Sequence, residues 1–131
     1  MPEITELLHD PSTTIAVIGA TDDPAKYGSR IYRDLKAKGF KVLAVNPNRD
    51  TVDGDPAYPT LVDLPERPTI LNFVVPPPTT LQVLRRARRL GHTNVWIQPG
   101  AESPEVLEEL ESGGYSYLAN ACIMVKSPTH A

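Results

Sequence analysis

Buried-strand patterns alternate with amphipathic helical patterns along most of this chain. Apolar runs rich in β-branched residues end at glycines or prolines, and charged segments with helical periodicity follow them. The strand patterns occupy residues 14–20, 41–47, 69–78, 94–100 and part of 115–125. Runs that are apolar on both faces are typical of a parallel sheet covered on both sides. This alternation constrains the fold more than any other feature of the sequence.

The helical patterns between these strands complete an α/β arrangement. They lie at residues 2–9, 29–38, 79–90 and 104–111, and Pro59 favours a short helix at 60–64. Right-handed crossovers then predict a doubly wound, Rossmann-like fold with about five parallel strands flanked by helices. The chain has 131 residues, which predicts a single domain. Within it, residues 1–13 form an N-terminal helix and lead-in, and residues 126–131 form a tail.

Charge and composition argue against several classes of protein. The net charge is −3, whereas nucleic-acid-binding domains usually carry a basic excess, so we expect no nucleic-acid partner. No run approaches the roughly 20 apolar residues that span a membrane, and the N-terminus lacks the pattern of a signal peptide. We therefore expect a cytoplasmic protein without membrane contacts. The single cysteine, Cys122, allows no internal disulfide.

The candidate binding residues follow the strands. In open α/β sheets the ligand lies beyond the carboxyl ends of the strands, at the point where the strand order reverses. Four strand ends carry glycines, prolines, amides, hydroxyls or cations that suit a small-molecule ligand. The candidate residues are Gly19, Ala20, Thr21, Lys26, Tyr27, Gly28, Ser29, Asn46, Pro47, Asn48, Arg49, Val75, Pro76, Pro77, Gln98, Pro99, Gly100 and Ala101.

The first of these strand ends favours a phosphate. Backbone N–H groups and Lys26 precede a predicted helix N-terminus, where an anion is stabilised by orphan amides and by the helix dipole. We expect Gly28 to permit a close backbone approach to that phosphate without being needed for the fold. The alternative is that these glycines are purely steric and that the turn is empty.

The second strand end distinguishes between nucleotide ligands. An NAD site usually has an acidic residue there, but this strand ends in Asn46-Pro47 and is followed by Arg49. A cation suits a ligand that carries a phosphate on its ribose, and both NADP and coenzyme A qualify. Eight residues separate Gly19 from Gly28. A loop this wide favours coenzyme A, because it leaves space for a bulkier or differently folded diphosphate.

The segments VIGATDDPAKYGS, VNPNR, the Pro-Pro pair after the third strand and WIQPG together resemble the small CoA-binding domain family. The chain is similar, over residues 14–125, to the N-terminal domain of succinyl-CoA synthetase α subunits and of ADP-forming acyl-CoA synthetases. The resemblance implies that residues 19–29 hold phosphates and that 46–49 lie near the adenosine. Residues 75–77 and 98–101 would line the path of the adenine and pantetheine.

One segment departs from that family. Many small members have Asp-Arg-Cys after the fifth strand, where this chain has Asn120-Ala121-Cys122, so no role of that acid or arginine carries over. Cys122 is expected at the same sheet edge as the ligand. It is either a buried, inert side chain or a thiol that can exchange with the CoA thiol.

The sequence offers no obvious catalytic machinery. His9, His92 and His130 fall near helix ends or in the tail, and we expect them on the surface. One cysteine and three scattered histidines do not predict a metal site. The sequence thus predicts a protein that binds coenzyme A or acyl-CoA without catalysis of its own. The alternatives are an NADP- or other nucleotide-dependent enzyme, and a regulatory module that has lost its ligand.

Two further features have structural interpretations. The arginines of residues 85–89 would form the solvated face of a helix whose inward face carries Leu81, Leu84, Ala87 and Leu90. Trp96 lies in an apolar strand pattern and is expected in the core.

Overall fold

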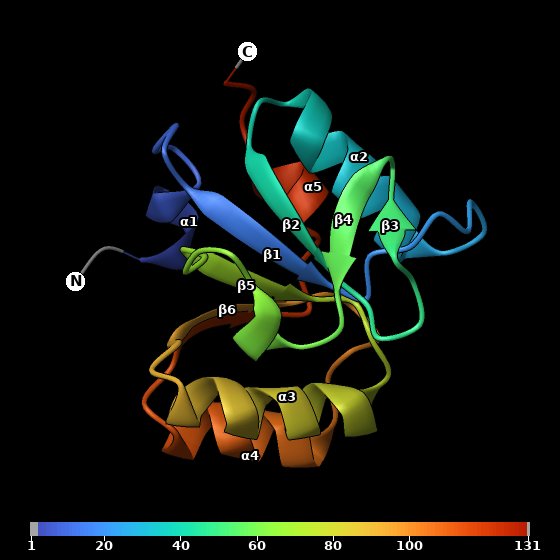
Figure 1. The fold of residues 1–131 in the computed structure, drawn as a ribbon. Coiled ribbons are helices and arrows are strands. Elements are labelled where there is room, and N and C mark those ends of the chain that lie inside the picture. Colours follow the sequence, from blue (N-terminus) through green and yellow to red (C-terminus); the bar gives the residue numbers. More distant parts are fainter. Residues whose placement is uncertain (1–2, 131) are drawn as a thin grey trace.

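A twisted, mostly parallel sheet forms the centre of the protein, as the computed structural model of residues 3–130 shows (Figure 1). Its strand order is β3-β4-β2-β1-β5-β6-β7, and only the β3–β4 pair is antiparallel. The strands are β1 (Thr14–Ile18), β2 (Lys41–Val45), β3 (Thr51–Val52), β4 (Asp55–Tyr58), β5 (Ile70–Phe73), β6 (Asn94–Ile97) and β7 (Ser116–Ala119).

Helices cover both faces of this sheet, which confirms the predicted Rossmann-like α/β class. One face is covered by α1, α2 and α5, and the other by α3 and α4, which lie side by side (Figure 1). The helices are α1 (Ile4–Leu7), α2 (Tyr27–Ala37), the 3-10 turn η1 (Leu61–Asp63), α3 (Pro77–Arg89), α4 (Pro104–Ser112) and α5 (Ile123–Lys126).

Each buried strand contributes to two apolar cores, because successive side chains point to opposite faces. In β1, Ile15 packs in the core beneath α2, whereas Ala16 packs in the core beneath α3 and α4. Trp96 is fully buried on the α2 side, which confirms its predicted place in the core. Its indole N–H donates to the carbonyl oxygen of Ala121 at 2.8 Å.

The number of strands is larger than the five predicted, because β3 and β4 form a hairpin in a segment with a weak sequence pattern. Asp53 and Gly54 join the two strands with positive φ angles of 51° and 79°. This is the backbone of a two-residue type I′ turn, in which Asp-Gly is a preferred pair. The β4 strand then pairs in parallel with β2 and extends the sheet beyond it.

Several predicted boundaries and exposures are wrong in detail. The α2 helix begins at Tyr27 rather than at residue 29, and α3 begins at Pro77, since a proline is well suited to the first helical position. The fifth predicted strand ends at Ala119 and is followed by α5. Leu90 is 38% exposed rather than inward-facing, and His92, expected on the surface, is buried at 9% exposure.

The C-terminal segment after α5 lies against the first two helices. The backbone N–H of His130 donates to the Lys38 carbonyl oxygen at 2.6 Å, and its ring Nε2 is 2.7 Å from the Leu8 carbonyl oxygen. The same ring packs edge-on against Phe40 with centroids 4.9 Å apart. Residues 1, 2 and 131, which belong to the predicted N-terminal helix and tail, lie outside the described residues.

Candidate functional site

A groove of about 1000 Å³ opens at the carboxyl ends of β1, β2 and β5. The strand order reverses here, because the chain proceeds from β1 to β2 on one side and later to β5 on the other. Such a switch point is the usual ligand site of an open α/β sheet. The groove is lined by Gly19, Thr21, Ala25, Lys26, Tyr27, Gly28, Asn46, Pro47, Asn48, Arg49, Val74, Val75, Pro76 and Thr79.

Two glycines let the turn after β1 pass close to its neighbours. Gly19 has a φ of 102°, and a Cβ there would lie 2.7 Å from the Val74 carbonyl oxygen. A Cβ on Gly28 would overlap the Gly19 carbonyl oxygen. The expectation that Gly28 is not needed for the fold is therefore wrong, because the first turn of α2 packs directly against the turn after β1.

The N-terminus of α2 gives the groove its positive character. Lys26 is the N-cap residue, no side chain within residues 3–130 caps the helix, and its first turn contains no acidic residue. The first N–H groups of a helix have no intrahelical acceptor, and they carry the positive end of the dipole. Lys26 itself is exposed at the groove. This combination suits an anionic group such as a phosphate.

The segment after β2 is tied to the loop after β1. The Asn46 side-chain amide donates to the Ala20 carbonyl oxygen at 2.9 Å, and its Oδ1 accepts from the Asn48 backbone N–H at 2.8 Å. Arg49 places Nη1 3.8 Å from a carboxylate oxygen of Asp22 and keeps 36% of its side chain exposed. A second cation therefore lines the groove, on the segment after β2.

An exposed aromatic ring borders the same opening. Tyr27, in the first turn of α2, is 62% exposed, and the Arg30 guanidinium lies 5.8 Å from its ring centroid. An exposed flat ring beside an anion site can stack against a base or another planar group.

Most of the sequence-predicted residues come together in this groove, but seven do not line it. Two of these seven lie behind its wall: Ala20 is buried, and Ser29 is 2% exposed. Pro77 begins α3 just past the lining residue Pro76. The remaining four are Gln98, Pro99, Gly100 and Ala101.

The loop after β6 is turned away from the groove. The Gln98 side chain is 3% exposed. It accepts a hydrogen bond from the Ile123 backbone N–H at 2.8 Å, and its amide nitrogen lies 3.4 Å from the Cys122 sulfur. Ala101 is 2% exposed. These contacts hold the start of α5 over the sheet, and Cys122 remains half-buried beside Gln98.

Sequence reasoning missed three lining residues, namely Ala25, Val74 and Thr79. Ala25 lies within the predicted segment 19–29, and Val74 directly precedes the segment 75–77. Thr79 sits in the first turn of α3, which begins two residues earlier than predicted. A proline-based start for α3 would have drawn attention to it.

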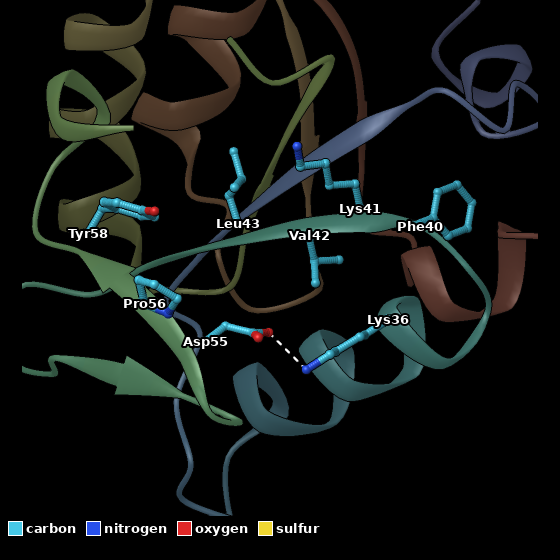
Figure 2. A pocket seen from close by; sticks show the side chains of 8 residues that line it. All are labelled: Lys36, Phe40, Lys41, Val42, Leu43, Asp55, Pro56 and Tyr58. Carbon is cyan, nitrogen blue, oxygen red and sulfur yellow. Dashed lines mark hydrogen bonds and ion pairs between the residues drawn. The ribbon is translucent and has the colours of Figure 1, made fainter. Parts of the chain in front are cut away.

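A second, smaller hollow of about 310 Å³ lies between β2, β4 and α2 (Figure 2). Its cations are already engaged: Lys36 binds Asp55 at 2.9 Å and Asp53 at 3.2 Å, and Lys41 pairs with Glu66. The Lys36 ammonium also lowers the pKa of Asp55 below its ordinary value. This hollow therefore offers less to an anionic ligand than the groove at the strand ends does.

Within residues 3–130, none of the helices has the length and apolar character of a membrane span. No three histidine, cysteine, aspartate or glutamate side chains in this part of the chain gather as a metal site would require.

The fold and the groove define a class of protein, a Rossmann-like domain with a site that suits an anion where the strand order reverses. Comparisons with known proteins identify the family within this class. The family model described as "CoA binding domain" matches residues 13–128. The chain belongs to this CoA-binding domain family.

The chain is also similar to individual proteins of known sequence and structure. The chain is 30% identical to the α subunit of acetate–CoA ligase [ADP-forming] II from Pyrococcus furiosus, over 89% of this chain and 28% of that protein. A solved conserved hypothetical protein from P. furiosus superposes with a TM-score of 0.84 at 45% identity, covering 88% of this chain and 99% of that one.

A larger enzyme contains a similar domain. The dinucleotide forming acetyl-coenzyme A synthetase 1 from Candidatus Korarchaeum cryptofilum, solved with phosphate and ADP, superposes with a TM-score of 0.73 at 33% identity. That match covers 88% of this chain and 27% of the synthetase. The chain thus spans about a quarter of the length of these ligase and synthetase chains.

Proposed function

We propose that this chain binds coenzyme A, or an acyl-CoA, in the groove at the carboxyl ends of β1, β2 and β5. The observation that carries the proposal is the uncapped N-terminus of α2, which opens into the groove beside the exposed Lys26. Backbone N–H groups, the helix dipole and one cation then act on the same ligand group, and the diphosphate of CoA supplies the matching negative charge.

A second charged contact comes from Arg49, on the segment after β2. Arg49 meets a carboxylate of Asp22 only at 3.8 Å, so its guanidinium can turn to a ribose phosphate at small cost. Two separated cations match a ligand with two separated phosphate groups. This feature supports coenzyme A over NAD, whose ribose hydroxyls would call for a carboxylate at the end of β2.

The proposed role is binding rather than catalysis. The lining residues supply amides, hydroxyls, cations and apolar walls, which hold and orient a ligand. General acid–base chemistry most often uses a histidine or carboxylate within hydrogen-bond reach of the reacting atoms. The protein would then store coenzyme A, sense its concentration, or present it to a partner enzyme.

Isothermal titration calorimetry with CoA, dephospho-CoA, NADP, NAD and ATP tests this proposal. We expect CoA to bind most tightly, and dephospho-CoA to bind more weakly because it leaves Arg49 without its phosphate. Tighter binding of NADP would favour a nucleotide-dependent enzyme instead. No binding of any of the five would favour a module without a ligand.

A further inference from the structure

The two helices on one face of the sheet carry opposite charges. Among the charged residues, α3 contains only arginines and α4 only glutamates. All of them are exposed except Glu109, which is half-buried. This face thus presents a positive row beside a negative row. The positive row is Arg85, Arg86, Arg88 and Arg89, and the negative row is Glu105, Glu108, Glu109 and Glu111.

Among residues 3–130, ion pairs neutralise only the inner seam between these rows. Glu109 lies 3.6 Å from Arg85 and 3.7 Å from Arg88, and it accepts a hydrogen bond from the Tyr115 hydroxyl at 2.9 Å. Within residues 3–130, the outer charges of both helices form no ion pair. These outer charges are Arg86, Arg89, Glu105, Glu108 and Glu111.

We infer that this face, formed by α3 and α4, is an interface between two copies of the chain. Both helices return from the carboxyl to the amino end of a parallel sheet, so they run in the same direction. A two-fold axis between them and along their length places α3 of one copy opposite α4 of the other. Each positive row then faces a negative row.

The heights of the charges fit this arrangement. Rotation about an axis along the helices leaves each residue at the same height. Arg85 and Arg88 already lie level with Glu109 inside one copy, as their ion pairs show. Counting along each helix from these pairs, Glu108 and Glu111 of the partner lie nearly level with Arg86 and Arg89, and Glu105 lies about one helical turn before Arg86. A two-fold axis across the helices would instead set α3 against α3 and oppose like charges.

Apolar side chains accompany the charges. A hollow of about 190 Å³ between the helices has Leu81 in its wall, together with Arg85, Glu105 and Glu108. Leu107 on α4 is 39% exposed. Protein interfaces combine such apolar contacts with a polar rim, and complementary charges fix their register. We expect a weak dimer whose stability falls as salt is added, because the charges are exposed.

This interface is separate from the groove. The groove contacts only the first turn of α3, at Pro76 and Thr79, whereas the arginines occupy the C-terminal half of the helix. Changes at the outer charges should therefore leave CoA binding intact. The dimer can form whether or not the ligand proposal holds.

Charge exchange between two variants tests the dimer by sedimentation velocity. The first variant carries Arg86→Glu and Arg89→Glu, and the second carries Glu105→Lys and Glu108→Lys; neither removes an ion pair seen within the chain. We expect each variant alone to be monomeric, since its changed positions carry the same sign as the outer charges that face them across the two-fold axis. An equimolar mixture should dimerise, because each row of one variant attracts a row of the other.

A matched control changes charges on the opposite face of the sheet. Glu3→Lys with Glu6→Lys, at and beside α1, makes the same change in net charge as the second variant and should dimerise like the native chain. Circular dichroism verifies that each variant is folded. The proposal is overturned if the native chain stays monomeric in low salt up to about 1 mM. It is equally overturned if both variants dimerise alone, or if their mixture stays monomeric.

Discussion

The carboxyl ends of β1 and β2 and the carboxyl end of β6 lie on the same edge of one sheet, yet only the first two open into the groove. After β1 the chain makes a wide loop and enters α2 with uncapped N–H groups. After β6, Gln98 turns inward and binds the start of α5. Strand ends that are equivalent in a parallel sheet therefore differ in whether they line the groove, according to the segment that later covers them.

The largest effect should come from Gly28, in the first turn of α2. Gly28→Ala places a Cβ against the Gly19 carbonyl oxygen, and Gly19 cannot retreat because it is itself close to Val74. We expect a loss of about 3 kcal/mol or more in the free energy of unfolding, measured by urea denaturation.

Gly100→Ala is the matched control in the loop after β6. Its φ is 93°, but no atom lies within 4 Å of the added Cβ. Only the backbone strain of about 1–2 kcal/mol should remain. Equal losses in the two variants would contradict the close packing of α2 against the turn after β1.

Gln98→Leu should show whether the residues after β6 contribute to the stability of the fold or to ligand binding. The variant leaves the buried Ile123 N–H without its acceptor, which costs about 1–3 kcal/mol in the free energy of unfolding. CoA affinity, measured by calorimetry, should change by less than about threefold, because Gln98 does not line the groove.

The exposed Gln82→Leu on α3 is the control for Gln98→Leu and should be close to neutral in both measurements. If Gln98→Leu remains folded but loses CoA binding, then residues 98–101 contact the ligand as the sequence predicted.

Lys26→Ala should weaken CoA binding by about tenfold, since a charge-assisted contact to a phosphate is lost. Its affinity should also depend less on salt than that of the native protein, because an exposed cation–phosphate contact is screened. Calorimetry at two salt concentrations measures both effects. Lys126→Ala, exposed on α5, should behave like the native protein. An unchanged salt dependence in Lys26→Ala would remove that side chain from the site.

The smallest predicted effect concerns His92. Burial, and then the neighbouring Arg67, lower the pKa of His92 from its ordinary value of 6.5. His92 therefore binds a proton more readily in the unfolded chain than in the folded one. Its contribution to stability is complete above pH 6.5, and it is lost as the pH falls from 6.5 toward the pKa of the folded state. Urea denaturation between pH 7.5 and 5 should show a smaller loss for His92→Gln than for the native chain. Identical pH profiles would show that His92 titrates alike in both states.

Local patterns were sufficient to predict the class of fold. The buried runs in β1, β2, β5, β6 and β7 and the glycine-ended helices each carry their own periodicity, and the crossover rule leaves few ways to assemble them. The β3–β4 hairpin was missed although Asp53-Gly54 is a strong turn signal. Its two strands are only two and four residues long, too short for alternation to show.

The sequence was sufficient to predict the part of the candidate site whose position is determined by the order of the strands in the sheet. Residues after β1, β2 and β5 come together because those strands are neighbours around the switch point. The residues after β6 could not be assigned in this way. Their orientation depends on α5, which lies more than twenty residues later in the chain and was not predicted at all.

The sequence alone thus determined the alternation of strands and helices, the phosphate-suited start of α2 and the cations beside it, because these depend on residues close together in the chain. The tertiary structure decided which strand ends remain open. It made Gly28 a packing residue, turned Gln98 inward and set a row of arginines beside a row of glutamates. Each of these outcomes depends on contacts between distant segments, whose geometry local propensity does not specify.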